Sequence, residues 1–174
     1  MKRIAIDMDE VIADSHGSLL RIYESEFGKR ILPEEVQGRS WEELVGEDHA
    51  AHIRRYPSRE GFFRALEPIA DSQQVLKALM EHYEVFIVSA ATEFPLSPNE
   101  KLAWLAEYFP FISWRNVVLC GDKSIIAADY LIDDHLKNLR TFTGTPLLFS
   151  APHNLRVTGY ERLHSWQDVA ARFL

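Results

Sequence analysis

The sequence contains little cysteine and no long apolar run, and each shortage excludes a class of protein. Only one of the 174 residues is a cysteine, Cys120, so an intramolecular disulfide framework and a cysteine-based zinc cage are excluded. No stretch approaches the ~20 apolar residues that a transmembrane helix needs. The apolar run near the N-terminus stops at Asp7 and is far shorter than that of a secretory signal peptide. We therefore expect a soluble, cytoplasmic protein without a membrane partner.

Basic residues are outnumbered by acidic ones. The chain has 19 Lys and Arg against 26 Asp and Glu, which gives a formal net charge of -7. A protein that binds a nucleic-acid polymer or an anionic membrane non-specifically needs a clustered basic face, so we expect neither partner. A small anionic ligand stays compatible with this balance, because one lysine and one metal ion can reverse the local charge.

The composition is otherwise that of a globular protein, with 47% apolar and 26% charged residues. The length suits one domain with a small insertion. Apolar runs alternate with stretches of helical spacing, except in segment 31–63, where we predict small helices. The sequence predicts strands over 3–7, 83–88, 116–120, 130–132 and 146–149, and helices over 14–27, 71–80, 98–109 and 125–128 and from 165 onward.

Strands that alternate with helices predict an α/β fold with a mostly parallel sheet, covered by helices on both faces. Such sheets bind ligands at the carboxyl ends of their strands. Polar residues follow four of the predicted strands: Asp7 and Asp9, then Ser89, then Lys123, then Asp133 and Asp134. We expect these side chains to meet at one edge of the sheet.

Four carboxylates in one place need a compensating cation. Two like charges at about 4 Å repel by about 4 kcal/mol at an effective dielectric near 20. Mg²⁺ favours carboxylate and carbonyl oxygens together with phosphate and water, so we predict this ion. Asp7 and Asp9 point the same way where the chain is extended, so one can attack phosphorus while the other protonates the leaving oxygen. Ser89 and Lys123 can hold phosphoryl oxygens, and the combined set predicts a site of phosphoryl transfer.

The same residues resemble a known family. Asp7-Met8-Asp9-Glu10-Val11 resembles the first motif of the haloacid-dehalogenase-like (HAD) phosphatases, and Ser89, Lys123 and Asp133-Asp134 resemble the second, third and fourth. Five blocks narrow the likeness to the 5′(3′)-deoxyribonucleotidases: DMDEVIAD, GFFRALEP, PNEKLAW, DKSIIAADYLIDD and RLHSW. The resemblance implies a HAD-like, Rossmannoid parallel sheet with a small helical cap, over about 31–63, inserted after the first strand and helix. Residues 1–30 and 64–174 would then form the core domain.

This resemblance also implies a role for each residue. Asp7 would be the nucleophile that forms an aspartyl-phosphate, and Asp9 the general acid and then the general base. The carboxylates of Asp7 and Asp134 and the backbone carbonyl of Asp9 would hold magnesium, with Asp133 as a neighbouring acceptor. Ser89, Lys123 and Lys101 would hold the phosphoryl oxygens. The substrate would be a (deoxy)nucleoside monophosphate, and the enzyme a monomer or a homodimer.

The residues that would read the substrate depart from the family pattern. The vertebrate enzymes carry glycine in place of Glu10, an aromatic residue in place of Ser15 and a permanently basic residue in place of His135. The candidate pocket residues are Ser15, Trp41, Phe62, Phe63 and His135. The three aromatic residues supply an apolar wall for a base or, in the alternative that we favour slightly, pack within the cap and core.

Other functions fit part of the pattern. A HAD phosphatase for a different small phosphate ester is the first alternative. A phosphoacceptor signalling domain also uses Asp, Ser or Thr, and Lys on a parallel sheet, but receivers place the lysine last, whereas Lys123 precedes Asp133 and Asp134. A dehalogenase is disfavoured, because Asp9 supplies the proton donor that phosphate chemistry requires.

Five further residues point to structure rather than chemistry. His49 and His52 have no evident third metal ligand, so we predict a solvated helix face. Cys120 ends an apolar strand and is predicted to be a buried, inert thiol. His153 and His164 have no nucleophile partner in the sequence, and we predict structural roles for both.

Overall fold

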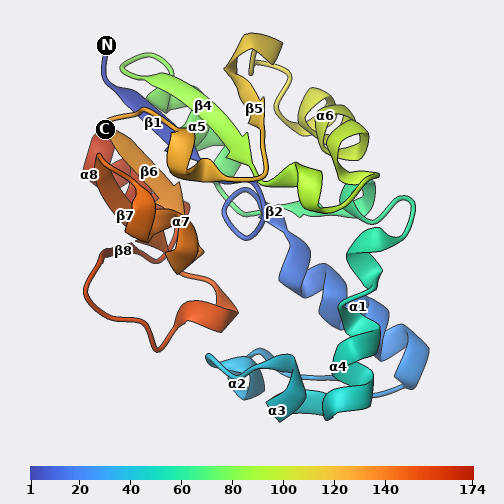
Figure 1. The fold of residues 1–174 in the computed structure, drawn as a ribbon. Helices are drawn as coiled ribbons and strands as arrows, with labels where there is room; N and C mark the ends of the chain where they lie inside the picture. The colour runs from blue at the N-terminus through green and yellow to red at the C-terminus, as the bar shows by residue number, and fades with distance from the viewer.

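The computed structural model describes the chain from Met1 to Leu174, apart from the side chain of Pro33. Parallel strands form one sheet in the order β5-β4-β1-β6-β7-β8 (Figure 1). These strands are β1 (Arg3–Ile6), β4 (Glu84–Ser89), β5 (Val117–Leu119), β6 (Tyr130–Asp133), β7 (Thr145–Phe149) and β8 (Glu161–Leu163). A separate antiparallel pair joins β2 (Ala13–Asp14) to β3 (Glu67–Pro68). The predicted α/β fold with a parallel sheet is confirmed.

Alternation along the strands divides the core into two apolar layers. Ile4 and Ile6 of β1 belong to the layer under three helices, whereas Ala5 belongs to the opposite layer, with Leu139. The first layer is covered by α5 (Ser72–Leu79), α6 (Ser97–Tyr108) and α8 (Trp166–Phe173), and the second by α7 (Leu136–Thr141). Because helices cover both faces, the sheet offers a ligand its carboxyl edge.

Strand register brings the predicted site residues to that edge. Ile6 of β1 is level with Ile87 of β4 and with Ile132 of β6. β1 ends at this level, β6 ends one residue beyond it at Asp133, and β4 ends two residues beyond it at Ser89. The predicted site residues therefore leave the sheet within two positions of the same height. The backbone amide of Asp7 still donates to the carbonyl of Ile132, at 2.9 Å, so Asp7 is fixed to the end of β6.

The segment predicted to be a cap forms short helices that lie beside α1 (Ser15–Phe27). In Figure 1, α1 leads away from the sheet, and α2 (Pro33–Val36), α3 (Trp41–Val45) and α4 (Glu47–Ile53) gather toward its far end. The hydroxyl of Tyr23 lies 2.7 Å from Nδ1 of His49, and Nε2 of His52 lies 3.0 Å from Glu26. These contacts join α1 to α4. The boundaries of the cap stay a prediction.

Several local predictions differ from the structure. The helix predicted over 125–128 is wrong: a single 3₁₀ turn covers Lys123–Ile125 instead. The carboxylate of Asp122 accepts from the amide of Ser124 at 2.8 Å, which starts the turn earlier. Asp71 lies just before α5 in the left-handed region, at φ 64°, and its side chain makes no capping hydrogen bond to the helix. The sequence analysis also missed α7, β8 and the β2–β3 pair. None of the helices described has the length and apolar character that a membrane span requires.

Candidate active site

A buried lysine joins the first and last acidic motifs. Nζ of Lys123 lies 2.5 Å from Oδ1 of Asp7 and 2.7 Å from Oδ2 of Asp133, and all three side chains are at least nine-tenths buried. Burial alone would lower the pKa of Lys123, but the charges of Asp7 and Asp133 outweigh it and raise that pKa. Burial likewise opposes ionisation of Asp7, yet Lys123 holds the pKa of Asp7 below its usual value. Lys123 therefore favours the ionised form of Asp7, which is the form that can act as a nucleophile.

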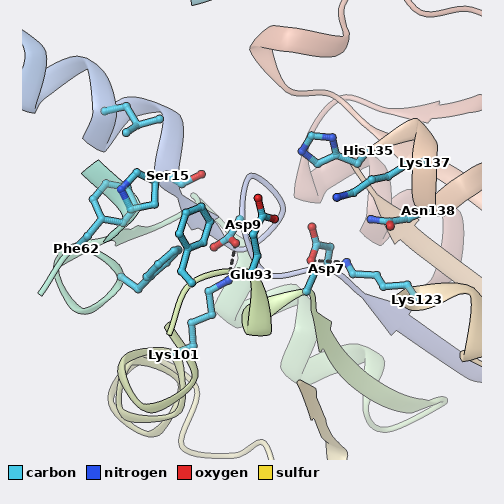
Figure 2. A pocket seen from close by; sticks show the side chains of 15 residues that line it. Asp7, Asp9, Ser15, Phe62, Glu93, Lys101, Lys123, His135, Lys137 and Asn138 are labelled. Atoms are coloured by element: carbon cyan, nitrogen blue, oxygen red, sulfur yellow. Dashed lines mark hydrogen bonds and ion pairs between the residues drawn. The ribbon is translucent and has the colours of Figure 1, made fainter. Parts of the chain in front are cut away.

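A second buried lysine holds the neighbouring carboxylate. Nζ of Lys101, on α6, donates to Oδ2 of Asp9 at 2.5 Å and to the hydroxyl of Ser89 at 2.8 Å. Lys101 is 2% exposed, and its ammonium also lies 4.6 Å from the ring centroid of Phe63. Two lysines thus face two aspartates across the site (Figure 2). A phosphoryl group between them would meet a cation on either side.

Asp134 is the least compensated carboxylate of the site. It is 1% exposed, and neither of its carboxylate oxygens has a hydrogen-bond partner among the described residues. Burial and the charges of Asp7 and Asp133 raise its pKa well above the ordinary value. One oxygen from each of these three carboxylates lies within 4.8 Å of the others. This set of hard oxygen donors fits a divalent ion such as Mg²⁺, which would supply the missing positive charge.

Glu10 joins the segment after β1 to the start of α1. Its backbone lies in the left-handed region, at φ 61°. Its carboxylate accepts from the hydroxyl of Ser15 at 2.6 Å and from the amide of His16 at 2.5 Å. Burial raises the pKa of Glu10 to about 7. The departures from the family pattern at Glu10 and Ser15 are thus one hydrogen-bonded pair at the start of α1.

A cavity of about 320 Å³ opens above the two aspartates, a volume that suits a small molecule. Lys101 and Lys123 line its polar part. Four of the five predicted pocket residues line it, namely Ser15, Phe62, Phe63 and His135, but Trp41 does not. Trp41 stacks instead on His16, with ring centroids 4.8 Å apart. Ser89, Asp133 and Asp134 are buried beneath the lining.

The aromatic wall of this cavity is fixed by one carboxylate. Glu100 of α6 accepts from the backbone amides of Gly61 and Phe63, at 2.7 and 3.0 Å. This contact fixes the backbone on both sides of Phe62. The chain that returns from the cap thus supplies the wall, and Glu100 anchors this chain to α6.

Sequence reasoning missed part of the lining. Glu93 follows β4, and Lys137 and Asn138 lie on the unpredicted helix α7; all three reach the cavity (Figure 2). Nδ2 of Asn138 lies 3.0 Å from both carboxylate oxygens of Asp133 and holds that side chain in place. Lys137 is an exposed cation at the mouth of the cavity. The signal that could have found this part of the lining was Lys137, three residues after Asp134.

The parallel sheet with its acidic edge is the fold of the HAD-like class, and comparisons with solved structures agree. A HAD family hydrolase from Deinococcus radiodurans R1, with bound phosphate and sodium, superposes with a TM-score of 0.65 at 13% identity, covering 99% of this chain and 94% of its own. A haloacid dehalogenase-like hydrolase from Streptococcus pneumoniae gives 0.62 at 14% identity, covering 100% and 99%. At these identities the likeness concerns the fold.

Sequence comparisons identify a family within the HAD-like class. The family model described as "5' nucleotidase, deoxy (Pyrimidine), cytosolic type C protein" matches residues 1–174. A 5'(3')-deoxyribonucleotidase from Bacillus subtilis (strain 168) is 40% identical over 176 residues, covering 99% of both chains. A Staphylococcus aureus (strain Mu50) relative is 42% identical over 173 residues, covering 99% of this chain and 96% of its own. The chain belongs to the 5'(3')-deoxyribonucleotidase family and is a phosphoric monoester hydrolase.

Proposed function

We propose that the protein is a magnesium-dependent phosphatase that hydrolyses (deoxy)nucleoside monophosphates, deoxyribonucleotides preferred, to nucleoside and phosphate. The observation that carries this proposal is the pairing of Asp7 with Lys123 and of Asp9 with Lys101 beneath a cavity with an aromatic wall. The floor suits a phosphoryl group and the wall suits a nucleobase. The name of the Bacillus subtilis relative supports a nucleotide as the substrate.

The residues of the acidic edge fit the proposed magnesium ion. The carboxylates of Asp7 and Asp134 and the backbone carbonyl of Asp9 would hold it, and Asp133, fixed by Lys123 and Asn138, would stay beside them. When bound, the ion would neutralise negative charge on the phosphoryl oxygens and keep them close to Asp7. The unpartnered, buried oxygens of Asp134 support this assignment.

The reaction would proceed in two displacements on phosphorus. An oxygen of Asp7 would attack phosphorus, and the bond from phosphorus to the nucleoside oxygen would break with its electron pair remaining on that oxygen. Asp9 would give its proton to the departing oxygen, which releases the nucleoside. Asp9 would then take a proton from a water molecule whose oxygen attacks the aspartyl-phosphate, and this step frees inorganic phosphate and the Asp7 carboxylate.

Lys101 links Asp9 to the residues that would hold phosphate. In the substrate-free chain its ammonium contacts Asp9 at 2.5 Å and the hydroxyl of Ser89 at 2.8 Å. A phosphoryl group that accepts from Lys101 and Ser89 would compete with Asp9 for this cation. That exchange would leave Asp9 to act on the leaving oxygen.

The proposal is tested by phosphate release from a panel of esters, with magnesium and with a chelator. The panel contains deoxy- and ribonucleoside 5′- and 3′-monophosphates, a sugar phosphate and an aryl phosphate. We expect magnesium-dependent release that is strongest for a deoxyribonucleotide. Phosphate release from the sugar or aryl phosphate alone would support a phosphatase and reject the nucleotide as its substrate. Phosphate release that the chelator leaves unchanged would reject the dependence on magnesium.

The nucleophile assignment needs its own variant. Asp7→Asn keeps the size of the side chain and removes the attacking carboxylate, so we expect kcat to fall by at least about 10³-fold. The matched control is Asp48→Asn, at an exposed position on α4, which should leave kcat unchanged. Near-normal turnover by Asp7→Asn with a folded circular dichroism spectrum would reject Asp7 as the nucleophile.

A further inference from the structure

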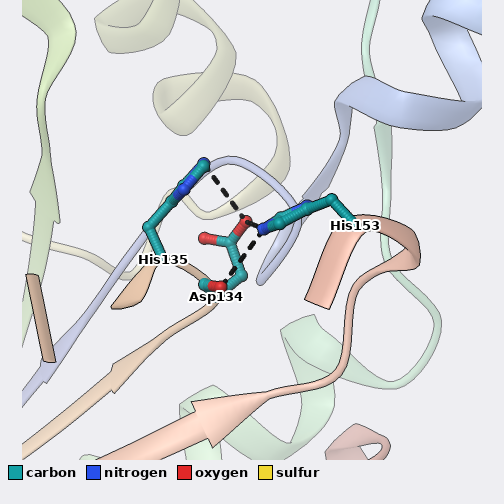
Figure 3. A group of neighbouring side chains, drawn as sticks. All are labelled: Asp134, His135 and His153. Carbon is teal, nitrogen blue, oxygen red and sulfur yellow. Dashed lines mark hydrogen bonds and ion pairs between the residues drawn. The ribbon is translucent and has the colours of Figure 1, made fainter. Parts of the chain in front are cut away.

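Two histidines face Asp134 on the side away from the core. His135 directly follows Asp134, and His153 lies in the 3₁₀ turn Pro152–Asn154 after β7. Nε2 of His135 is 3.7 Å from Oδ2 of Asp134, and Nε2 of His153 is 3.4 Å from the same oxygen (Figure 3). The two imidazole rings are stacked, with centroids 4.6 Å apart and planes inclined by 22°. Both histidines thus place Nε2 within 4 Å of the same carboxylate oxygen.

We propose that Asp134, His135 and His153 form a binding site for a borderline transition-metal dication, of which Zn²⁺ is the example that we argue. Zinc binds imidazole nitrogen and carboxylate oxygen at about 2.0–2.2 Å, so two ligands on a tetrahedral ion lie about 3.4 Å apart. The observed separations of 3.4 and 3.7 Å from the carboxylate are close to this value. One ligand atom from each residue lies within 4.8 Å of the others.

The chemistry of the donors separates this site from the proposed magnesium site. Imidazole nitrogen suits zinc, copper and nickel, whereas Mg²⁺ takes oxygen ligands in octahedral geometry. The acidic edge around Asp7 offers oxygen alone, and the histidine side offers two nitrogens with one oxygen. The two sites share Asp134, but they should select different ions because their other donors differ.

The burial of Asp134, which supports the magnesium ion, points to a cation on the histidine side as well, because the unpartnered Oδ2 is the oxygen that faces both histidines. Its carboxylate is 1% exposed and accepts no hydrogen bond from any described residue, although two histidines lie within 4 Å. A buried carboxylate without such bonds costs free energy, and a cation would offset that cost. The side chains of His135 and His153 are 54% and 38% exposed, so an ion reaches the site from solvent, and water can complete the coordination.

The second histidine is held in place by its neighbour. Asn154 donates from Nδ2 to the backbone carbonyls of Asp134 and Phe149, at 2.9 and 2.8 Å, which ties the turn to the ends of β6 and β7. In the metal-free chain Nε2 of His153 lies 3.2 Å from the carbonyl oxygen of Asp134. Zinc binding would replace that contact by coordination, in the tautomer that carries its proton on Nδ1.

The test measures metal binding without substrate. The chelator-stripped chain is titrated with Zn²⁺ by calorimetry and with Co²⁺ by visible absorption, in both cases with excess Mg²⁺ present. We expect one equivalent to bind, and the Co²⁺ complex to show the intense visible bands of a four-coordinate site. The double variant His135→Asn, His153→Asn should lose more than about 100-fold in affinity, because disturbing even an outer partner costs about 10–100-fold. The matched control is His164→Asn, whose ring contacts Ser150 at 3.2 Å.

Three results would overturn the proposal: no binding in the presence of Mg²⁺, equal affinity in the double variant, or loss of the site in Asp7→Asn but not in the histidine variants. The last result would place zinc at the acidic edge. A consequence for activity rests on the proposed function: because Asp134 is shared, Zn²⁺ should inhibit the magnesium-dependent reaction, and His153→Asn should raise the half-inhibiting concentration. A chain that binds zinc as stated but hydrolyses no ester would refute the proposed function and leave the site intact.

Discussion

Replacement of Lys123 by methionine tests whether this lysine stabilises the fold as well as the reaction. The ammonium lies 2.5 Å from Asp7 and 2.7 Å from Asp133, and the side chain is 1% exposed. Methionine fills similar space without the charge, so the two carboxylates would stay buried beside Asp134 with no cation. Breaking a buried ion pair by removing one partner costs about 3–5 kcal/mol. At about 2–4 °C per kcal/mol for a chain of this size, Tm should fall by about 6–20 °C.

The assay is urea unfolding followed by circular dichroism at two pH values. Without Lys123, the pKa values of the buried carboxylates should lie above their unfolded values, since burial and mutual repulsion already act to raise them. The folded variant then binds more protons than the unfolded chain, so its stability rises as pH falls. We expect the loss in free energy of unfolding caused by Lys123→Met to be smaller at pH 5 than at pH 8. Added Mg²⁺ should stabilise the variant more than the parent, because no ammonium repels the ion.

Lys137→Met is the matched control for Lys123→Met. Lys137 lies at the same site but is exposed, and a surface change of this kind moves the free energy of unfolding by no more than about 0.5 kcal/mol. A deficit below about 1 kcal/mol for Lys123→Met at pH 8 would refute the reasoning, because it would mean that the three acidic side chains do not need this cation. A deficit that grows toward pH 5 would refute it as well.

Two further variants test the mouth of the cavity and the cap. Lys137→Ala should raise KM severalfold with little change in kcat, because an exposed cation at the mouth attracts the substrate anion; an effect that 0.5 M salt does not shrink would contradict this electrostatic role. Glu26→Gln should lower Tm at neutral pH. Arg59 and Tyr56 hold the pKa of Glu26 at about 2, against 4.5 for the free side chain. The stabilisation is thus present above pH 4.5 and lost as pH falls toward 2. If Tm of the parent and of Glu26→Gln changed in parallel from pH 7 to pH 3, this stabilisation by ionised Glu26 would be excluded.

The acidic edge could be predicted because strand ends leave a clear signal in the sequence. Arg3–Ile6 is a short apolar run that ends at an acid, and Tyr130–Asp133 ends in the same way. Parallel strands that are buried on both faces must be apolar throughout, so the first polar residue marks the point where the chain leaves the sheet. The rule that ligands bind at this edge then placed Asp7, Lys123 and Asp133 together before any contact was known.

Elements with little apolar content could not be found in this way. In α7, a helix of six residues, Asn138 and Leu139 are the buried members, and His135 gives it no side-chain cap. Two of the three residues of β8 are charged, because an edge strand is partly solvated. Neither element has the periodicity that identifies a longer helix or a central strand. The failure to predict α7 affected the predicted site, because α7 brings Lys137 and Asn138 to the cavity.

Pairings between distant residues are the other part that local pattern could not supply. Lys101 and Asp9 are 92 residues apart, and the family resemblance indicated that Lys101 holds phosphate without indicating that it holds Asp9. The same holds for Glu10 and Ser15, which depart from the family pattern as two separate residues but form one hydrogen bond. The Ser15 hydroxyl donates to Glu10, so toward a ligand in the cavity it can act only as an acceptor. A change of Ser15 to an aromatic residue alone would leave Glu10 buried without its hydroxyl partner. A change toward the family pattern would therefore have to replace Glu10 and Ser15 together.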